Sequence, residues 1–292
     1  MQCFTSKDQL IKFLVPYFYE HGLHCSLNHL DISALDDLSF LFSPSYNTYF
    51  QGKYIEFHRF NGDISQWDTS QVTDMHSMFY RSEFNGDISK WDVTRVENMT
   101  GMFQESRFNG DISSWDVSNV KQMGALFEDG LFNRDISKWN TSKVREMFSM
   151  FKNTPFDGDL SNWDVSSVTT MASMFDGCPF HGDLSRWNVS NVREMVFIFF
   201  NKHEFPCVDS WVLHPQVDAA LAFGIDSPGV PLSSLSIAQG LREQQGAHYW
   251  AKWNFPQALW CSSTEEIGRT ANALYHASRQ VSEPLFLTRL PD

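Results

Sequence analysis

Hydrophobic and polar positions repeat along most of the chain with a period of 24 residues. Seven tryptophans mark this period: Trp67, Trp91, Trp115, Trp139, Trp163, Trp187 and Trp211. Counted from an Ile or Leu, each of six full repeats places Trp three residues on, Val or Thr five on, Val eight on and Met eleven on. A fixed period of this length is typical of a solenoid, in which each rung buries its apolar face only against its neighbours. The pattern therefore predicts stacked rungs, and a repeated surface favours binding over a unique catalytic pocket.

Within one rung the spacing of apolar residues changes. Around Trp67 the side chains alternate with period two, which predicts a short strand. From Val72 to Phe79 the apolar residues are spaced by three, three and one, which predicts one face of a short helical turn. Ser70, or its Ser or Thr equivalent in the other rungs, is a candidate N-cap or turn former.

The Asn-Gly-Asp stretch before each expected strand has the composition of a turn. Gly permits a positive φ, and Asp can accept a hydrogen bond from its own backbone two residues on. Arg134 replaces this Gly in the fourth repeat, so a positive φ is not required there. The tryptophans and all methionines except Met1 have core spacing, and we interpret both as buried stacks rather than as an exposed binding platform.

The repeat FNGDISKWDVTRVENMTGMF (84–103) resembles the BspA-type leucine-rich repeats, also described as mycoplasma-type lipoprotein repeats. Phe, Asp, Ser, Trp, Val and Met stay in register over about residues 60–211. The I-x-x-W-x-V-x-x-V spacing also overlays the frame of leucine-rich repeats. The resemblance implies a curved α/β solenoid, a leucine-rich-repeat-like right-handed coil of 24-residue rungs. It also implies binding to other proteins or cell surfaces.

The N-terminal segment carries the same pattern with one interruption. Residues 31–42 match residues 68–79 at an offset of 37 rather than 24 residues, so we expect an insertion at about 46–58. Upstream, Gln9 to Glu20 has the pattern of an amphipathic helix, in which Pro16 is a possible kink. We therefore predict an N-terminal helical cap over residues 1–29 and a solenoid over residues 30–211.

After Trp211 the repeat pattern stops, because Val212-Leu213-His214-Pro215 does not continue it. Helix-like stretches lie at 217–223, 237–244 and 264–278. Residues 212–292 are therefore expected to form a small helical C-terminal domain or cap.

The formal net charge of −13 argues against nucleic acid and against an anionic membrane as partners. The five cysteines form no zinc-type spacing, and we expect no cofactor. The N-terminus has no basic region and no cleavage site of a secretory signal. We therefore expect a cytoplasmic protein, or one exported by a route without a classical signal peptide.

The residues that flank each tryptophan should point outward and select a partner. The candidate partner-binding residues are Gln66, Asp68, Lys90, Asp92, Ser114, Asp116, Lys138, Asn140, Asn162, Asp164, Arg186 and Asn188. The residue before Trp varies strongly, whereas the residue after it is Asp or Asn in all six rungs. An alternative interpretation is that this Asp or Asn, with the Ser or Thr two residues on, only stabilises a turn.

A second acidic column consists of Asp63, Asp87, Asp111, Asp135, Asp159 and Asp183. Calcium is conceivable there, but each rung offers few ligands close in sequence, so turn structure is the preferred interpretation and no metal is expected.

Candidate catalytic groups are confined to the C-terminal segment and match no known motif; they are His214, His248, Cys261, Glu265 and Glu266. The sequence predicts a non-catalytic scaffold that recognises a protein of unknown identity. The alternatives are a secreted effector with an enzymatic C-terminal domain and a cell-surface adhesin.

Overall fold

The structure is a computed structural model that describes residues 2–201, 206–208, 210–214, 216–219 and 222. Within this part of the chain, the helices and strands lie near the N-terminus. They are β1 (Gln2–Cys3), α1 (Lys7–His21), β2 (Leu30–Asp31), the 3-10 helix η1 (Pro44–Tyr46), β3 (Thr48–Phe50), β4 (Lys53–Ile55) and the 3-10 helix η2 (Phe57–Arg59).

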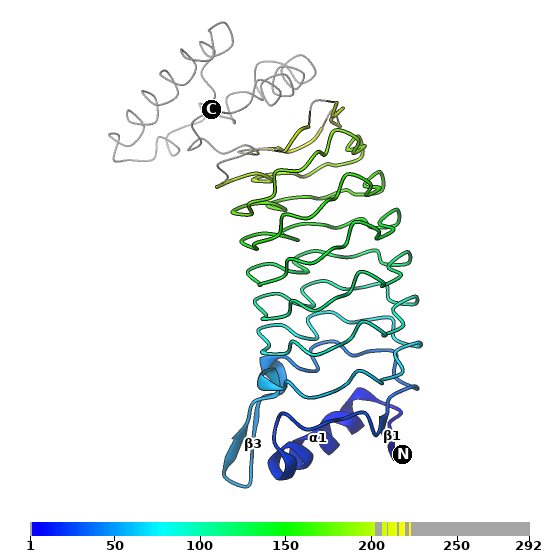
Figure 1. Cartoon of the computed structure of the whole chain (residues 1–292), viewed down its shortest axis with the longest axis vertical. Helices are drawn as coiled ribbons and strands as arrows, with labels where there is room; N and C mark the ends of the chain where they lie inside the picture. Colours follow the sequence, from blue (N-terminus) through cyan, green and yellow to red (C-terminus); the bar gives the residue numbers. More distant parts are fainter. Residues whose placement is uncertain (1, 202–205, 209, 215, 220–221, 223–292) are drawn as a thin grey trace, which may run out of the picture.

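The remaining described residues form a stack of rungs along the long axis of the molecule (Figure 1). Parallel bridges join equivalent residues of successive rungs, in the order Asp37, Asp74, Asn98, Gln122, Glu146, Thr170, Glu194 and Asp218. Beside each bridge the backbone N–H groups donate to carbonyls of the next rung, as from Met99 to Gln122 (2.9 Å) and from Phe103 to Leu126 (2.9 Å). The prediction of a repeat solenoid is therefore confirmed.

The secondary structure within a rung differs from the prediction. Trp115 lies at the end of a turn, which its N–H closes by donating to the Ile112 carbonyl (3.2 Å), and not in a strand. The expected helical turn is also absent between Val120 and Phe127. The N–H groups of Met123, Ala125 and Phe127 donate to the next rung, and the Leu126 N–H closes a four-residue turn on the Met123 carbonyl (3.3 Å). The i to i−4 bonds of an α-helix therefore do not form here. The predicted strand and helical turn are therefore wrong, although the prediction of stacked 24-residue rungs is confirmed.

In each of the six full repeats, two residues of the bridged segment have left-handed backbone. In one rung they are Gly101 (φ 61°) and Glu105 (φ 53°), and in the next they are Ala125 (φ 53°) and Asp129 (φ 55°). The glycine of the Asn-Gly-Asp turn does not use the positive φ that glycine permits, which agrees with the presence of Arg134 at this position in the fourth repeat. A methyl group on Gly86 would lie 2.8 Å from Phe84 Cζ, so this glycine leaves room for the ring two residues earlier.

Columns of aromatic rings fill the core. Trp67 and Trp91 stack with centroids 6.3 Å apart and planes 6° apart, and each indole N–H donates to a carbonyl of the preceding rung, as from Trp91 to Ile64 (3.1 Å). The seven repeat tryptophans are 2–7% exposed, and the ten repeat methionines are at most 2% exposed. The buried interpretation of both columns is therefore confirmed.

Neighbouring rungs are farther apart at their tryptophan rings than at their bridged backbones. Stacked tryptophans of neighbouring rungs have centroids 6.3–6.4 Å apart, whereas bridged backbones lie about 4.8 Å apart.

Helix α1 lies across the N-terminal end of the stack (Figure 1). Ser6 caps it by accepting from the Gln9 N–H (3.3 Å), and Leu10, Leu14 and Phe18 are buried. Pro16 is accommodated inside the helix. Strand β1 pairs in parallel with β2, and β3 pairs with β4 in an antiparallel hairpin. This hairpin interrupts the rung pattern, since Asp37 bridges to Asp74 at an offset of 37 residues.

The stack continues past the boundary that we placed at Trp211. Asp218 bridges to Glu194, and the Phe199 N–H donates to the Ala222 carbonyl (2.8 Å). Within the stretch 217–223 that we expected to be helical, the described residues 217–219 and 222 are not helical and continue the stack. Val212 replaces the usual Asp or Asn after Trp211, and His214 closes a turn two positions further along, because its Nδ1 accepts from the Gln216 N–H (3.0 Å). The helices expected over 237–244 and 264–278 lie outside the described residues.

Removing one indole from the middle of the stack should destabilise the protein strongly. We expect Trp115→Ala to lower the free energy of unfolding by about 3–5 kcal/mol through lost burial and the cavity left behind. Trp115→Phe should lower the free energy of unfolding less, because it keeps a ring in the core, although it loses the hydrogen bond to the Ile88 carbonyl (3.1 Å). Urea denaturation followed by circular dichroism measures both. Equal, small losses would show that the column carries little of the stability.

Candidate functional site

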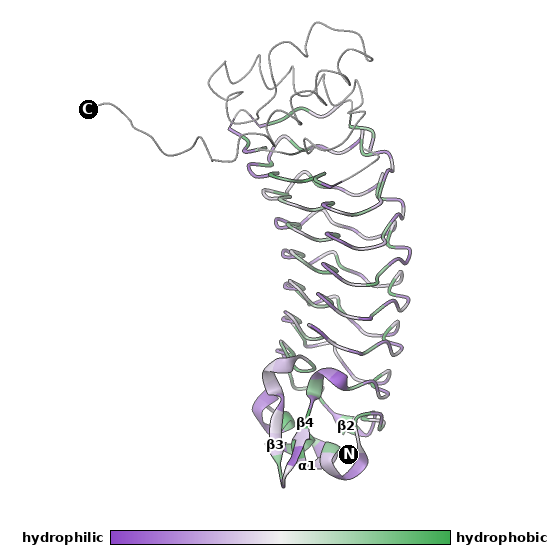
Figure 2. Ribbon diagram, turned by 90° about the vertical axis from the view of Figure 1, so that its left-hand side faces the viewer, coloured by the Kyte–Doolittle hydropathy of each residue, from purple (hydrophilic) through white to green (hydrophobic). Residues whose placement is uncertain are grey.

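The residues predicted to contact a partner form two columns beside the buried tryptophans. All twelve are exposed, as the alternation of hydrophilic and hydrophobic residues along each rung suggests (Figure 2). The residue before Trp lies in the turn that leads into it, and the residue after Trp begins the next turn. The structure thus brings the twelve residues to one face of the stack. Whether a partner binds them stays a prediction.

The Asp or Asn column has a structural role. Asp92 Oδ1 accepts from the Thr94 N–H (2.9 Å), and Asn140 Oδ1 accepts from the Ser142 N–H (3.2 Å). Asp68, Asp116, Asp164 and Asn188 make the same bond to the residue two positions on. Hydrogen bonds from Ser118 hold the pKa of Asp116 below its ordinary value. These side chains stabilise turns, so the variable column is the stronger candidate for selecting a partner.

The second acidic column is built in the same way. Asp87 Oδ1 accepts from the Ser89 N–H (2.9 Å), and the other five aspartates accept equivalent bonds of 2.8–3.0 Å. Because the serine N–H and hydroxyl stabilise the charged form, the pKa of each carboxyl in this column lies below its ordinary value. The preferred turn interpretation is confirmed. Among the described residues, no group of three or more His, Cys, Asp or Glu is placed to hold a metal ion.

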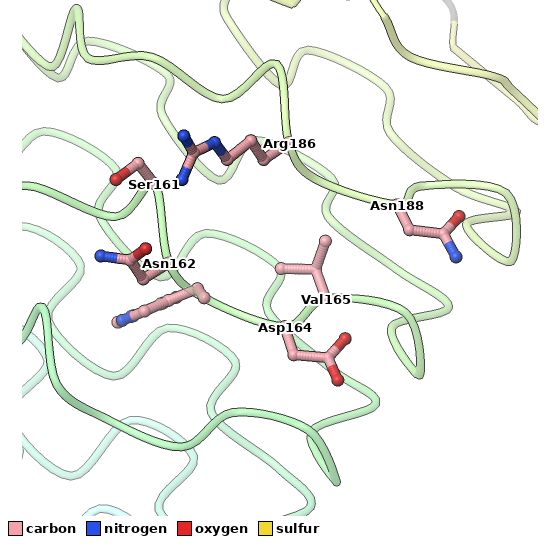
Figure 3. A pocket seen from close by; sticks show the side chains of 7 residues that line it. Ser161, Asn162, Asp164, Val165, Arg186 and Asn188 are labelled. Atoms are coloured by element: carbon pink, nitrogen blue, oxygen red, sulfur yellow. The ribbon is translucent and has the colours of Figure 1, made fainter.

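An open depression of about 310 Å³ lies between the fifth and sixth repeats, at the residues that flank their tryptophans. Asn162 and Asp164 line it from one rung, and Arg186 and Asn188 line it from the next. The Arg186 side chain extends in the direction of Ser161 (Figure 3). Guanidinium, amide, carboxylate and hydroxyl groups therefore line the depression around Trp163 and Val165, which suits hydrogen bonding to a polar partner surface.

The candidate catalytic residues are not assembled into a site. His214 Nδ1 is engaged by the Gln216 N–H, so it serves a turn. His248, Cys261, Glu265 and Glu266 lie outside the described residues.

Sequence reasoning missed an asparagine column that joins the rungs. The Asn85 N–H donates to Asn61 Oδ1 (3.0 Å), and the Asn109 N–H donates to Asn85 Oδ1 (2.8 Å). The recurrence of Asn directly after the repeat Phe was visible, but we interpreted it as turn composition alone. The outward side chains of the bridged segment, which also form columns along the stack, were missed because we expected a helical turn there.

No helix in the described part of the chain has the length and apolar character needed to cross a bilayer. The sequence matches one protein family over residues 45–155 and 129–225, described as "Mycoplasma protein of unknown function, DUF285". No curated protein and no solved structure matches the chain.

The acidic column should make stability depend on pH. A pKa lowered in the folded state contributes stability above the unfolded value, near pH 4, and this stability is lost as pH falls through the folded pKa. Asp87→Asn, Asp111→Asn and Asp135→Asn together keep an oxygen for each turn bond but remove the titration. We therefore expect the triple variant to lose less thermal stability than the original protein between about pH 5 and pH 2. Identical losses in the two proteins would contradict this role.

Proposed function

The chain belongs to the family of Mycoplasma proteins of unknown function called DUF285, and we propose that it is a non-catalytic protein-recognition scaffold. Its partner protein binds the repeat surface beside the tryptophans. The observation that carries the proposal is the contrast between a nearly invariant buried frame and an exposed column that varies from rung to rung. This column consists of Gln66, Lys90, Ser114, Lys138, Asn162 and Arg186.

The frame gives this column the rigidity that recognition needs. Each variable residue directly precedes a tryptophan that is buried and whose indole N–H donates to a carbonyl of the preceding rung. A surface held in place before binding loses little conformational entropy on association. Three of the six residues are cations: Lys90, Lys138 and Arg186. They alternate with neutral residues along the column, a pattern that acidic groups of a partner can match.

We also propose the repeat class and the handedness of the stack, namely a BspA-type leucine-rich-repeat-like coil of right-handed sense. In this coil α1 caps the N-terminal end and protects its backbone from pairing elsewhere. A small helical C-terminal segment completes this proposed architecture. We place the protein in the cytoplasm, or outside the cell by a route without a classical signal peptide.

Charge reversal along the variable column tests the proposed function. A partner is first isolated with the full-length protein from a lysate of the source organism or its host, and its affinity is then measured by calorimetry. The triple variant Lys90→Glu, Lys138→Glu and Arg186→Glu should bind it roughly tenfold or more weakly. Its thermal unfolding should be little changed, because the three side chains are exposed.

The matched control is Lys12→Glu with Arg107→Glu, which reverses the charge of two exposed side chains outside the variable column. It should retain affinity for this partner. Unchanged binding by the triple variant would reject the tryptophan-flanking face.

A further inference from the structure

The bridged segment presents an outward column that varies more than those beside the tryptophans. Two positions after each bridge residue the column reads His76, Thr100, Gly124, Phe148, Ala172 and Val196. Its first members are polar, whereas its last three are apolar and half-buried. A structural column would repeat one residue type, as the tryptophan and methionine columns do. This one changes its chemistry along the stack.

Phe148 is held in place by the rung before it. Its ring lies against Gly124, where a methyl group would come within 2.7 Å of Phe148 Cδ1. Because Gly124 has no side chain, the Phe148 ring can occupy this space. The ring remains half-buried rather than enclosed, which leaves an ordered apolar surface beside Ala172 and Val196.

Basic side chains border this apolar column. On the third to sixth rungs, three outward columns consist of the bridge residue, the residue before it and the residue three before it. Together these columns hold two carboxylates, Glu146 and Glu194, and four cations, Lys121, Lys143, Arg145 and Arg193. Lys121 pairs with Glu97 (2.7 Å), and Lys143 donates to Asn119 Oδ1 (2.6 Å).

The two arginines differ from these lysines. Throughout the part of the chain that the structure describes, the guanidinium groups of Arg145 and Arg193 form no ion pair or hydrogen bond with other residues. Both residues are exposed. In a chain with a net charge of −13, two uncompensated guanidinium groups beside an apolar column form a local site for negative charge.

The spacing of the arginines limits what fits. Arg145 and Arg193 occupy equivalent positions two rungs apart, so their backbones are separated by roughly 10 Å along the stack. An extended polyproline-II segment rises about 3.1 Å per residue and returns to the same face every third residue. Two carboxylates three positions apart therefore meet both guanidinium groups, and an apolar side chain between them lies near Phe148.

We propose that this face is a second docking surface, which takes an extended acidic segment of a partner protein with two carboxylates three residues apart and a neighbouring apolar residue. The charge of the two unpaired arginines selects the carboxylates, and the column from Phe148 to Val196 takes the apolar side chain. This surface is separate from the tryptophan-flanking columns and does not depend on them.

A display library of random twelve-residue peptides on the full-length protein tests the proposal. The selected peptides should be enriched in Asp or Glu pairs three positions apart with an apolar residue nearby. For a synthetic copy of the best peptide, Arg145→Glu with Arg193→Glu should weaken binding roughly tenfold or more, and Phe148→Ala should weaken it several-fold. The variant Lys90→Glu with Lys138→Glu is the matched control, and it should bind this peptide unchanged.

Thermal unfolding of each variant shows that the fold is retained. The proposal is overturned if no acidic peptides are enriched, or if reversing the two arginines leaves the affinity unchanged. It is also overturned if the Lys90→Glu, Lys138→Glu variant loses the peptide to the same extent, because the peptide would then bind the other face.

Discussion

The hydrogen bonds that each rung makes to the next are the constraint on which the rest of the structure depends. The bridged segment satisfies alternate N–H groups with carbonyls 23 residues further on, as from Met99 to Gln122, and satisfies those between with local turns. Equivalent residues must therefore recur at the same interval, and this explains the strict period of 24. Backbone hydrogen bonds thus join the described rungs, although these rungs contain neither helix nor long strand.

Side chains then enforce this register. A shift of one residue would remove every Trp from its stack and every indole N–H from its carbonyl. The aspartates and asparagines around the tryptophans close turns and add inter-rung bonds, so the most regular polar residues are structural. What remains free to vary without harming the frame is the residue before each Trp and the outward side of the bridged segment. A scaffold of this type can change its surface rung by rung while keeping its fold.

The sequence predicted the stack, the buried aromatic and methionine columns and the exposure of all twelve candidate residues, because each depends on a period that is visible along the chain. It did not predict where the rungs pair. The spacing from Val72 to Phe79 equals that of a helix face, and only the long-range hydrogen bonds distinguish the two. The end of the solenoid was also placed too early. His214 closes a turn two positions beyond the usual Asp or Asn, and the repeat pattern gives no sign of this turn. The surface around Phe148 went unnoticed for the same reason as the pairing, since the segment that carries it was expected to be helical.

Amide hydrogen exchange tests the central claim most directly. It should distinguish bonds between rungs from the turns that connect them, when measured on the intact protein with residue or short-peptide resolution. The amides of Met99, Gly101, Phe103 and Glu105 should exchange slowly, as should their equivalents 24 residues on. The exposed amides of Asp87 and Lys90 should exchange much faster. Bridged segments that exchange as fast as these turns, or protection confined to α1, would contradict a solenoid held together by inter-rung hydrogen bonds.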